Sequence, residues 1–412
     1  MQREHVDVVA AGELLDQPQQ ARHDALAARA IDAAGHDQAD AHAHQHLTEG
    51  VDAVASRSSE VGSRRITSGW RSVGAIVIAL AAVAAVRGAA AQALTMYFID
   101  VEGGQSTLIV TAAGESLLVD TGYDGFAGRD AKRILAAARD AGLRQIDFLL
   151  MTHFHQDHDG GIVELSRQMP IRTFFDHGDL IRSPEALAES RWEPTAAAYA
   201  AYASARAKGK HVEPEPGDRL PLKGVDAVWV SSAAATIRTP LEGAGQANAA
   251  CPAAAPPAAE KLENPRSTGF HLRFGKFRFV DLGDLSGAPF FALVCPASLL
   301  GPIDLYLVPH HGGADTAYAA AFAAVQPRVA LINNGATKGA SVEVFAALRA
   351  VPGVDVWQLH RSTLPGARNF GDERIANLDE STGHWIKAVA SEDGFFTVTN
   401  GRTGATVSYK AR

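Results

Sequence analysis

Short hydrophobic runs separated by glycine-containing turns begin at Leu94, and this pattern is typical of a sheet rich in hairpins. Helical and strand-like segments then alternate, because Ile134 and Leu135 fall on one face of a helical pattern that precedes a continuous apolar run. In chain order, the pattern predicts strands over 96–100, 106–110 and 116–120, a helix over 129–141, a strand over 146–151, a helix over 161–168, a strand over 171–175, and a helical stretch over 184–208 interrupted at Pro194.

The second half of the chain repeats this order. It predicts strands over 269–274 and 276–282, followed by strand 303–308, helix 315–325, strand 328–332, helix 341–350 and strand 354–359. Two halves that are each rich in strands first and alternate afterwards favour an α/β protein with two packed sheets and helices outside. Between them, residues 232–265 are rich in Ala, Pro and Gly, so we expect a surface insertion there.

The first 93 residues follow a different pattern. Residues 73–86 form an apolar run that is too short to cross a bilayer comfortably as a straight helix. Arginines precede this run and Ala91-Gln92-Ala93 follows it, which predicts a signal peptide over residues 61–93, cleaved after Ala93. The mature protein would then be periplasmic or secreted, with an uncleaved anchor as the alternative. Residues 1–60 lack sustained periodicity, and we expect a disordered extension or a misassigned start.

Composition narrows the possible classes of protein. The chain has 412 residues, 47% hydrophobic and 20% charged, which excludes a collagen-like, wholly disordered or disulfide-scaffold protein. A formal net charge of -8 argues against a stable complex with nucleic acid. Two cysteines cannot build a zinc ribbon, so any metal site must use histidines and carboxylates. In an exported protein Cys251 and Cys295 could form a disulfide, and two buried free thiols are the alternative.

The strongest chemical signal is Thr152-His153-Phe154-His155-Gln156-Asp157-His158-Asp159-Gly160-Gly161. This string follows the predicted strand 146–151 and leads into the predicted helix 161–168. A loop held between two regular elements brings its imidazoles and carboxylate to one point. Such ligands suit Zn²⁺ and related metals, so the loop predicts a metal site.

Through this motif, the sequence resembles the metallo-β-lactamase fold superfamily. Four further segments carry the resemblance: Phe98-Ile99-Asp100-Val101-Glu102-Gly103-Gly104-Gln105, Leu117-Leu118-Val119-Asp120-Thr121-Gly122, Gly283-Asp284-Leu285 and Val308-Pro309-His310-His311-Gly312. The doubled histidine resembles the metallo-hydrolase domain of bacterial DNA-uptake channel (competence) proteins and phosphorylcholine esterases. The resemblance covers nearly all of residues 94–412, and it implies a four-layer α/β/β/α sandwich with the site along one edge of the two sheets.

The resemblance also implies a set of metal ligands. His153 and His155 would bind the first metal, Asp157 and His158 the second, Asp284 would bridge the two, and His311, next to Gly312, would be the last ligand. The superfamily's third histidine of the first metal has no counterpart in the corresponding stretch, residues 228–236. We expect His177 to replace it, with His211 as a poorer alternative. If neither serves, the first metal is weakly held.

The expected chemistry is hydrolysis by a metal-bound hydroxide. Asp157 would orient the hydroxide, and either His310 or a metal-bound water would protonate the leaving group. Because strand ends often line such a site, we expect substrate contacts from Asn333, Asn334, Lys338 and His360.

We therefore expect an exported zinc-dependent hydrolase with one or two Zn²⁺ ions, or Mn²⁺, acting on a small molecule and favouring a phosphoester or phosphodiester. A β-lactam or lactone hydrolase is one alternative, and a catalytically inactive metal-binding protein is the other. We expect neither a stable nucleic-acid complex nor a transmembrane partner.

Overall fold

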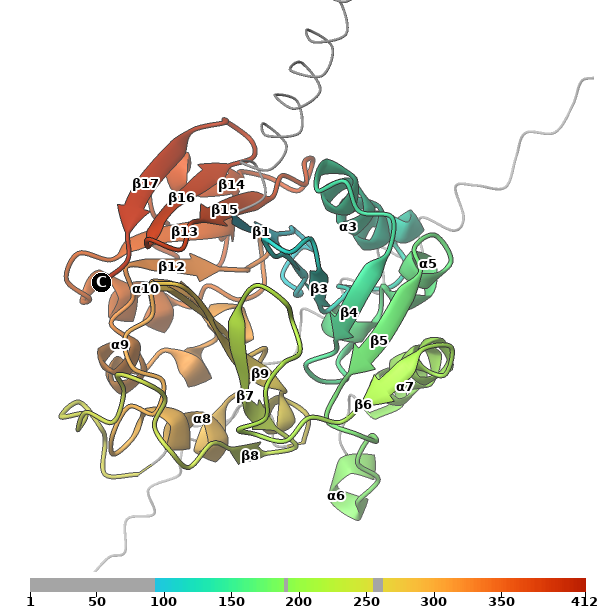
Figure 1. Cartoon of the computed structure of the whole chain (residues 1–412), viewed down its shortest axis with the longest axis horizontal. Coiled ribbons are helices and arrows are strands. Elements are labelled where there is room, and N and C mark those ends of the chain that lie inside the picture. Colours follow the sequence, from blue (N-terminus) through green and yellow to red (C-terminus); the bar gives the residue numbers. More distant parts are fainter. Residues whose placement is uncertain (1–92, 189–191, 255–261) are drawn as a thin grey trace, which may run out of the picture. The chain divides into compact units, whose positions relative to one another are not determined.

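Two β-sheets organise the computed structural model, which describes residues 93–188, 192–254 and 262–412 (Figure 1). Within these residues, one sheet has 9 strands in the order β17-β16-β15-β1-β2-β3-β4-β5-β6 and the other has 8 in the order β14-β13-β12-β11-β10-β9-β7-β8. The predicted N-terminal extension and signal peptide lie outside the described residues, apart from Ala93. Among the described helices, none has the length and apolar character needed to cross a bilayer.

The strand bounds agree with most of the sequence-based expectations. The first sheet contains β1 Leu94–Phe98, β2 Thr107–Val110, β3 Ser116–Val119, β4 Ile146–Leu150, β5 Ile171–Phe175, β6 Lys210–Val212, β15 Ile386–Ala390, β16 Phe395–Asn400 and β17 Thr406–Lys410. The second contains β7 Asp226–Ser232, β8 Ala235–Thr236, β9 Gly269–Phe274, β10 Phe277–Asp281, β11 Leu305–Leu307, β12 Val329–Ile332, β13 Asp355–His360 and β14 Ile375–Asn377. Strands β6 to β8 and β14 to β17 were not predicted.

Helices connect and cover the sheets. They are α3 Arg129–Asp140, α4 Gln156–Asp159, α5 Ile162–Ser166, α6 Pro184–Leu187, α7 Trp192–Arg206, α8 Gly287–Val294, α9 Ala319–Val325 and α10 Val342–Arg349, with short 3-10 turns η1 Phe126–Gly128, η2 Asn264–Arg266, η3 His310–Gly312, η4 Ala314–Thr316 and η5 Asp372–Arg374. The predicted interruption at Pro194 is wrong, because Pro194 lies in the first turn of α7, where its missing N–H has no partner to lose. The helix predicted from residue 315 begins later, at Ala319, because η4 occupies the preceding segment.

Three apolar clusters make a sandwich of four layers. One cluster fills the space between the sheets, where the ring of Phe98 from β1 lies 5.9 Å from that of Phe279 from β10. A second joins the outer face of the first sheet to α3, α5 and α7, and a third joins the outer face of the second sheet to α8, α9 and α10. The predicted α/β/β/α arrangement is therefore confirmed.

The parallel strands decide where polar side chains gather. Strands β3 to β6 run parallel in the first sheet, and β10 to β14 run parallel in the second. The carboxyl ends of parallel strands meet at one edge of a sheet, and ligand sites in α/β proteins form beyond such ends. The loops after β4, β10, β11, β12 and β13 carry the residues described next.

Candidate metal centre

The loop after β4 brings the first motif into place. His153 and His155 precede α4, while Asp157 and His158 lie in its single turn. Close packing of neighbouring loops fixes this segment. A Cβ on Gly161 would lie 2.1 Å from the carbonyl oxygen of Thr121, and one on Gly104 would lie 2.3 Å from that of Asp157. Glycine is thus required at both positions because another backbone occupies the space of a side chain.

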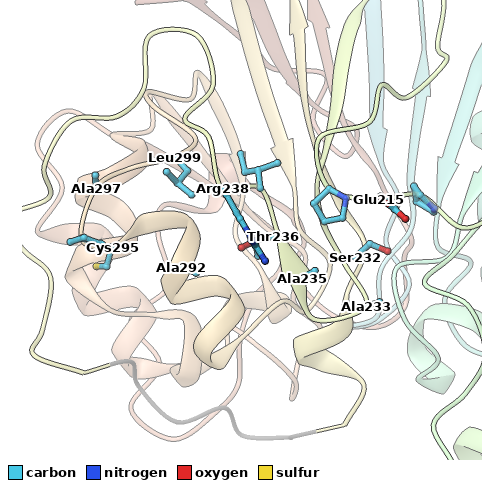
Figure 2. Close-up of a pocket in the computed structure, with 14 residues that line it drawn as sticks. Glu215, Ser232, Ala233, Ala235, Thr236, Arg238, Ala292, Cys295, Ala297 and Leu299 are labelled. Carbon is cyan, nitrogen blue, oxygen red and sulfur yellow. The ribbon is translucent and has the colours of Figure 1, made fainter.

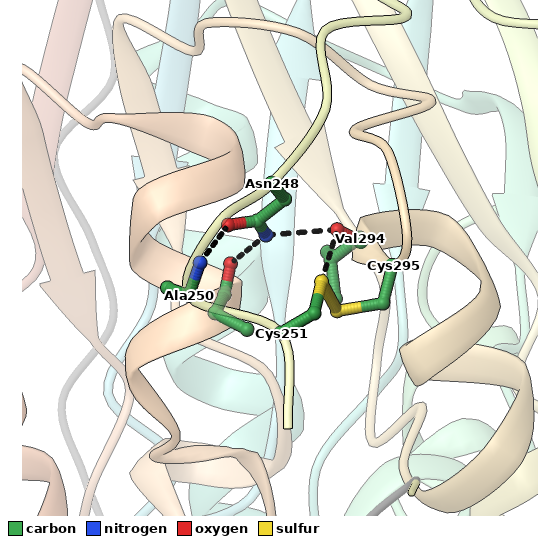
Figure 3. Close-up of a disulfide and its surroundings, with 6 residues drawn as sticks. Asn248, Ala250, Cys251, Val294 and Cys295 are labelled. Atoms are coloured by element: carbon green, nitrogen blue, oxygen red, sulfur yellow. Dashed lines mark hydrogen bonds between the residues drawn. A yellow bond between two sulfur atoms is a disulfide. The ribbon is translucent and has the colours of Figure 1, made fainter. Parts of the chain in front are cut away.

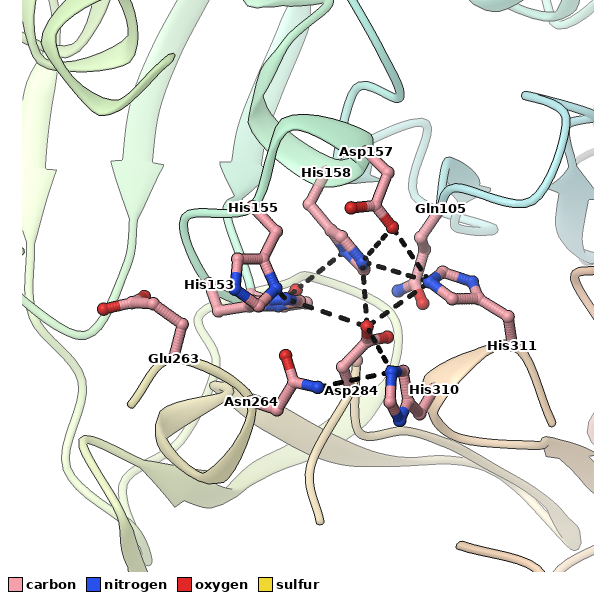
Figure 4. Close-up of polar contacts among 12 residues, drawn as sticks. Gln105, His153, His155, Asp157, His158, Glu263, Asn264, Asp284, His310 and His311 are labelled. Atoms are coloured by element: carbon pink, nitrogen blue, oxygen red, sulfur yellow. Dashed lines mark hydrogen bonds and ion pairs between the residues drawn. The ribbon is translucent and has the colours of Figure 1, made fainter. Parts of the chain in front are cut away.

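Four side chains from three separate loops converge in what we call the second donor group, namely Asp157, His158, Asp284 and His311. Their ligating atoms all lie within 4.8 Å of one another (Figure 4). The Nε2 atom of His311 is 3.1 Å from Oδ2 of Asp157 and 3.3 Å from Oδ2 of Asp284. The Nε2 atom of His158 is 3.2 Å and 3.3 Å from the same two oxygens.

A smaller set, which we call the first donor group, contains His153, His155 and Asp284. The Nε2 atom of His153 lies 2.9 Å from Nδ1 of His155 and 3.8 Å from Oδ2 of Asp284. Asp284 belongs to both groups, which is the position expected of a bridging carboxylate.

His177 does not lie in the first donor group. Its Nε2 atom is 3.0 Å from Oε2 of Glu263, and that same oxygen accepts the backbone N–H of Phe154 at 3.1 Å. His211 is farther along the same sheet, where it pairs with Asp176 at 2.9 Å. Within the described residues, the first donor group therefore has two histidines and one carboxylate, whereas the second has two of each.

Buried carboxylates and hydroxyls orient the histidines. Oδ2 of Asp120 lies 2.7 Å from Nδ1 of His158 and also accepts the hydroxyl hydrogen of Thr152 at 2.7 Å. The other oxygen of Asp120 accepts the backbone N–H of Thr152 at 2.7 Å. Such a carboxylate–histidine contact fixes the ring and leaves Nε2 facing the donor group, as in known metal sites.

The electrostatic field of the site favours positive charge. Burial by itself disfavours a charged His158, but Asp284, Asp157 and Asp120 outweigh it and raise the pKa of His158 well above its usual value. Burial would raise the pKa of Asp157, yet Lys338 and His158 hold it well below its usual range. In the same way, His311 and His158 overcome burial and lower the pKa of Asp284.

These residues fit a bound divalent metal ion. Imidazole nitrogens and carboxylate oxygens are the usual ligands of Zn²⁺ and of iron, and carboxylates also suit Mn²⁺. Buried charges of this kind are normally paired or coordinate a metal. The Oδ1 atom of Asp284 is buried and has no hydrogen-bond partner among the described residues. A metal ion would satisfy that atom.

His310 stands beside the donor groups, where an aspartate orients it. Its Nδ1 atom lies 2.8 Å from Oδ1 of Asp315. Its Nε2 atom lies 3.7 Å from Oδ2 of Asp284 and 3.3 Å from Nδ2 of Asn264 (Figure 4). Both His310 and His311 have a positive φ, 51° and 53°, so the tight η3 turn sends the two neighbouring rings in different directions. His311 joins the second donor group, while His310 keeps 21% of its side chain exposed.

The predicted substrate contacts occupy different environments. Lys338 forms an ion pair with Asp157 at the site. Asn334 is fully buried, and its amide donates to the carbonyls of Gly335 and His360, so it holds a loop rather than facing solvent. Asn333 is also buried and donates to Gln105. These two side chains therefore support the loop that carries Lys338.

His360 lies in a separate buried network. Its Nε2 atom is 3.1 Å from Asp100 and 3.0 Å from Glu102, and the guanidinium of Arg133 donates to both carboxylates at 2.7 Å and 2.9 Å. The side chain of His360 is 0% exposed. It is thus enclosed by protein, in contrast to Lys338, whose side chain is 35% exposed.

Sequence reasoning missed several residues of the site. Asp120, Asp315 and Glu263 had no assigned role, although Asp120 carries a recognisable signal as a charged residue that directly follows an apolar strand and precedes Thr121-Gly122. No local signal identifies Glu263, because it reaches the site only when the end of the 232–265 segment folds back.

Residues of the 232–265 segment also form part of a cavity away from the donor groups. A hollow of about 980 Å³ lies between the β7–β8 hairpin and the end of α8, and it is lined by Ser232, Thr236, Arg238, Ala292 and Leu299 among others (Figure 2). The two cysteines pair in a disulfide beside it, and the Asn248 amide donates to the carbonyl oxygen of Val294 at 2.9 Å (Figure 3). The disulfide links the insertion to the end of α8. Of the two alternatives, a disulfide and two free thiols, the disulfide is therefore confirmed.

Comparison with known families supports the resemblance. Residues 99–246 match the family described as the Metallo-beta-lactamase superfamily. This part of the chain contains the loop with His153, His155, Asp157 and His158, so the predicted resemblance to that superfamily is confirmed. The narrower resemblance to competence proteins stays a prediction. No curated protein matches the chain in sequence.

Similar solved structures include the metallo-beta-lactamase fold protein YhfI from Bacillus subtilis, at 13% identity over 65% of this chain and 96% of that chain, with a TM-score of 0.39. CmlA, a diiron beta-hydroxylase from Streptomyces venezuelae, is similar at 15% identity over 64% of this chain and 47% of that chain, with a TM-score of 0.33. A metallo-beta-lactamase from Cronobacter sakazakii is similar at 15% identity over 51% of this chain and 68% of that chain, with a TM-score of 0.30.

Proposed function

Since the chain carries a metallo-β-lactamase superfamily domain, we propose that it is an exported, metal-dependent hydrolase of a phosphoester or phosphodiester. The observation that carries the proposal is the pair of donor groups that share Asp284. A carboxylate common to two sets of metal-ligating side chains is the arrangement needed to hold two ions close together. The second donor group would hold one ion through Asp157, His158, Asp284 and His311, and the first would hold another through His153, His155 and Asp284.

Metal ions held in this way would generate a nucleophile from water at neutral pH and polarise the oxygen of the substrate. The chain's own residues orient the ligands. Asp120 fixes the ring of His158, and within the second donor group Oδ2 of Asp157 lies 3.1 Å from Nε2 of His311. Burial of the donors limits the access of bulk water, which strengthens electrostatic interactions at the site.

His310 is suited to deliver a proton to the leaving group. Asp315 holds its Nδ1 atom, so that the Nε2 atom faces Asp284 and the partly exposed side of the site. Burial alone would lower the pKa of His310, but the carboxylates of Asp284 and Asp315 outweigh it and raise the pKa above its usual value. A positioned imidazole with this pairing is a common general acid.

The choice of a phosphoester rests on the His310-His311-Gly312 segment, which resembles that of phosphorylcholine esterases and competence proteins. The metal is proposed to be zinc, with manganese as a substitute. Export is supported by the Cys251–Cys295 disulfide, since disulfides persist mainly in oxidising compartments.

The test is hydrolysis of bis(p-nitrophenyl) phosphate by the full chain loaded with zinc, manganese or iron, with a chromogenic β-lactam assayed in parallel. We expect phosphodiester turnover that disappears in His155→Ala but persists in His384→Ala, a matched change outside both donor groups. Turnover of the β-lactam alone would overturn the proposed substrate class. Full activity in His155→Ala would overturn the role of the first donor group.

A further inference from the structure

A lysine and a tyrosine lie against the Asp157 side of the second donor group. Lys338, in the loop after β12, forms an ion pair with Oδ2 of Asp157. Its Nζ atom also lies 3.2 Å from the hydroxyl oxygen of Tyr123, which belongs to the loop after β3. The ammonium group is 5.5 Å from the centre of the Tyr123 ring. We call these two residues the Lys338–Tyr123 pair.

The loop that carries Lys338 is firmly held. The backbone N–H of Gly335 donates to the carbonyl of Lys338 at 2.9 Å, which closes a tight turn, and the N–H of Ala340 donates to the carbonyl of His311 at 2.8 Å. A Cβ on Gly103 would lie 2.9 Å from the backbone nitrogen of Gly335, so the neighbouring loop packs directly on this turn. Lys338 is therefore attached to the same framework as the metal-ligand candidate His311.

The positive charge of Lys338 has two opposing effects, because it competes with a metal ion and attracts an anion. The carboxylates of Asp157 and Asp284 attract both its ammonium group and any divalent cation, so the lysine and the metal compete for the same negative charge. A group that holds a metal next to a lysine carries excess positive charge. That excess attracts an anion, and the partly exposed side chain of Lys338 leaves it within reach of solvent.

We propose that the Lys338–Tyr123 pair binds an anionic oxygen of a phosphoryl group at the second donor group. The inference rests on the proposed function, because it names the part of the site that recognises the phosphoester. Lys338 supplies a point charge with several donors, and the Tyr123 hydroxyl supplies a neutral hydrogen bond beside it. Two fixed donors select an oxygen-rich anion over an uncharged acyl compound.

This role predicts opposite changes when Lys338 loses its charge. The Lys338→Met variant should bind Zn²⁺ at least about tenfold more tightly, because a like charge is gone, and should bind inorganic phosphate at least about tenfold more weakly. Lys338→Arg keeps the charge and should retain phosphate binding. Tyr123→Phe should weaken phosphate binding several-fold and leave the affinity for Zn²⁺ unchanged.

The experiment uses the full chain and two readouts that do not depend on turnover. Zinc affinity is measured by competition with a chromogenic chelator, and binding of inorganic phosphate to the zinc-loaded protein is measured by calorimetry, with acetate as a carboxylate probe. The matched control is Lys387→Met, because Lys387 forms a similar contact with Asp140 at 2.9 Å and lies 4.6 Å from the ring of Tyr97, away from the site. Thermal unfolding reports whether each variant is folded.

Unchanged phosphate affinity in folded Lys338→Met would overturn the inference, as would tighter binding of acetate than of phosphate by the wild-type protein. If Lys338→Met fails to fold, Tyr123→Phe decides the question, and phosphate affinity equal to that of the wild type overturns the inference. These outcomes differ from failure of the proposed function. That failure would appear as absence of phosphodiester turnover in the wild type even though phosphate binds and depends on Lys338.

Discussion

Two buried regions of this protein combine histidine with carboxylates at similar distances, yet the carboxylates of the two regions face different cations. At the donor groups, Asp284 and Asp157 face the histidines His158 and His311, and the nearest cation is a partly exposed lysine. In the second region, which we call the His360 network, Asp100 and Glu102 face His360 and the guanidinium of Arg133.

The difference lies in how each region balances its charge. Arg133 donates to both carboxylates of the His360 network and also to the carbonyl of Thr382, so two positive groups offset two negative ones inside the protein. At the donor groups several imidazoles converge on one point, and the cation beside the carboxylates is the partly exposed Lys338 rather than an enclosed guanidinium. Residue types alone therefore do not define a metal site, because the partners of the carboxylates decide whether a metal is needed.

The sharpest test of this contrast is Asp284→Asn. The variant removes the charge shared by both donor groups, so we expect loss of bound metal from both and a fall in hydrolysis on the order of 10³-fold or more. Metal content is measured by elemental mass spectrometry alongside phosphodiester turnover. Asp304→Asn, which alters another buried aspartate far from the site's loops, is the matched control and should keep its metal. A fully metallated Asp284→Asn would contradict the bridging role.

A smaller effect is expected from Asp120→Asn, which leaves every candidate ligand in place. The carboxylate of Asp120 orients His158 from behind, and removal of such a partner typically lowers metal affinity by about 10- to 100-fold. The measurement is zinc affinity by chelator competition, with Asp147→Asn as a control in the same sheet. Affinity equal to that of the wild type would mean that the packing of His158 alone fixes its ring.

Glu263→Gln probes the asymmetry between the two donor groups. Burial would raise the pKa of Glu263, but its hydrogen bond with His177 lowers it, so Glu263 is an anion that holds Phe154, the residue between His153 and His155. Loss of a charge-assisted hydrogen bond costs about 1.5 to 3 kcal/mol. We expect weaker binding of only the first metal, seen as a second, lower-affinity step in a zinc titration. Glu242→Gln, which alters an exposed ion pair, should leave both steps unchanged.

The smallest effect on function is expected from His360→Gln, which should leave metal content and turnover near the wild-type values. Its effect is on stability. Burial by itself lowers the pKa of His360, but hydrogen bonds with Asp100 and Glu102 raise it to about 9. Protonated His360 therefore stabilises the folded state fully below about pH 6.5, and this contribution disappears as the pH rises through about 9.

Denaturant unfolding at several pH values measures this contribution. The free energy of unfolding of the wild type should exceed that of His360→Gln by roughly 3 kcal/mol near pH 6, and this difference should shrink as the pH approaches 9. A difference that does not vary with pH would show that His360 acts through packing alone. Loss of a bound metal in this variant would remove the distinction between the His360 network and the donor groups.

The sequence by itself determined the architecture and most of the donor set. Alternation of short strands and helices predicted the two sheets and their outer helices, because buried parallel strands read as continuous apolar runs. The string from His153 to His158 predicted a metal site by itself, since a short loop brings its side chains together independently of the rest of the fold. The segments around Asp284 and His311 were found through the family resemblance.

Only the tertiary structure decided which distant residues complete the site. His177 was expected in the first donor group but lies on Glu263, while Lys338 meets Tyr123 across 215 positions of sequence. His360 was expected to contact substrate, and Asp100, Glu102 and Arg133 enclose it instead. Contacts of this kind depend on how loops from two sheets pack along one edge. The physical reason is that local patterns fix the elements and their nearby side chains, whereas the partner of a buried charge is whichever group the folded chain places beside it.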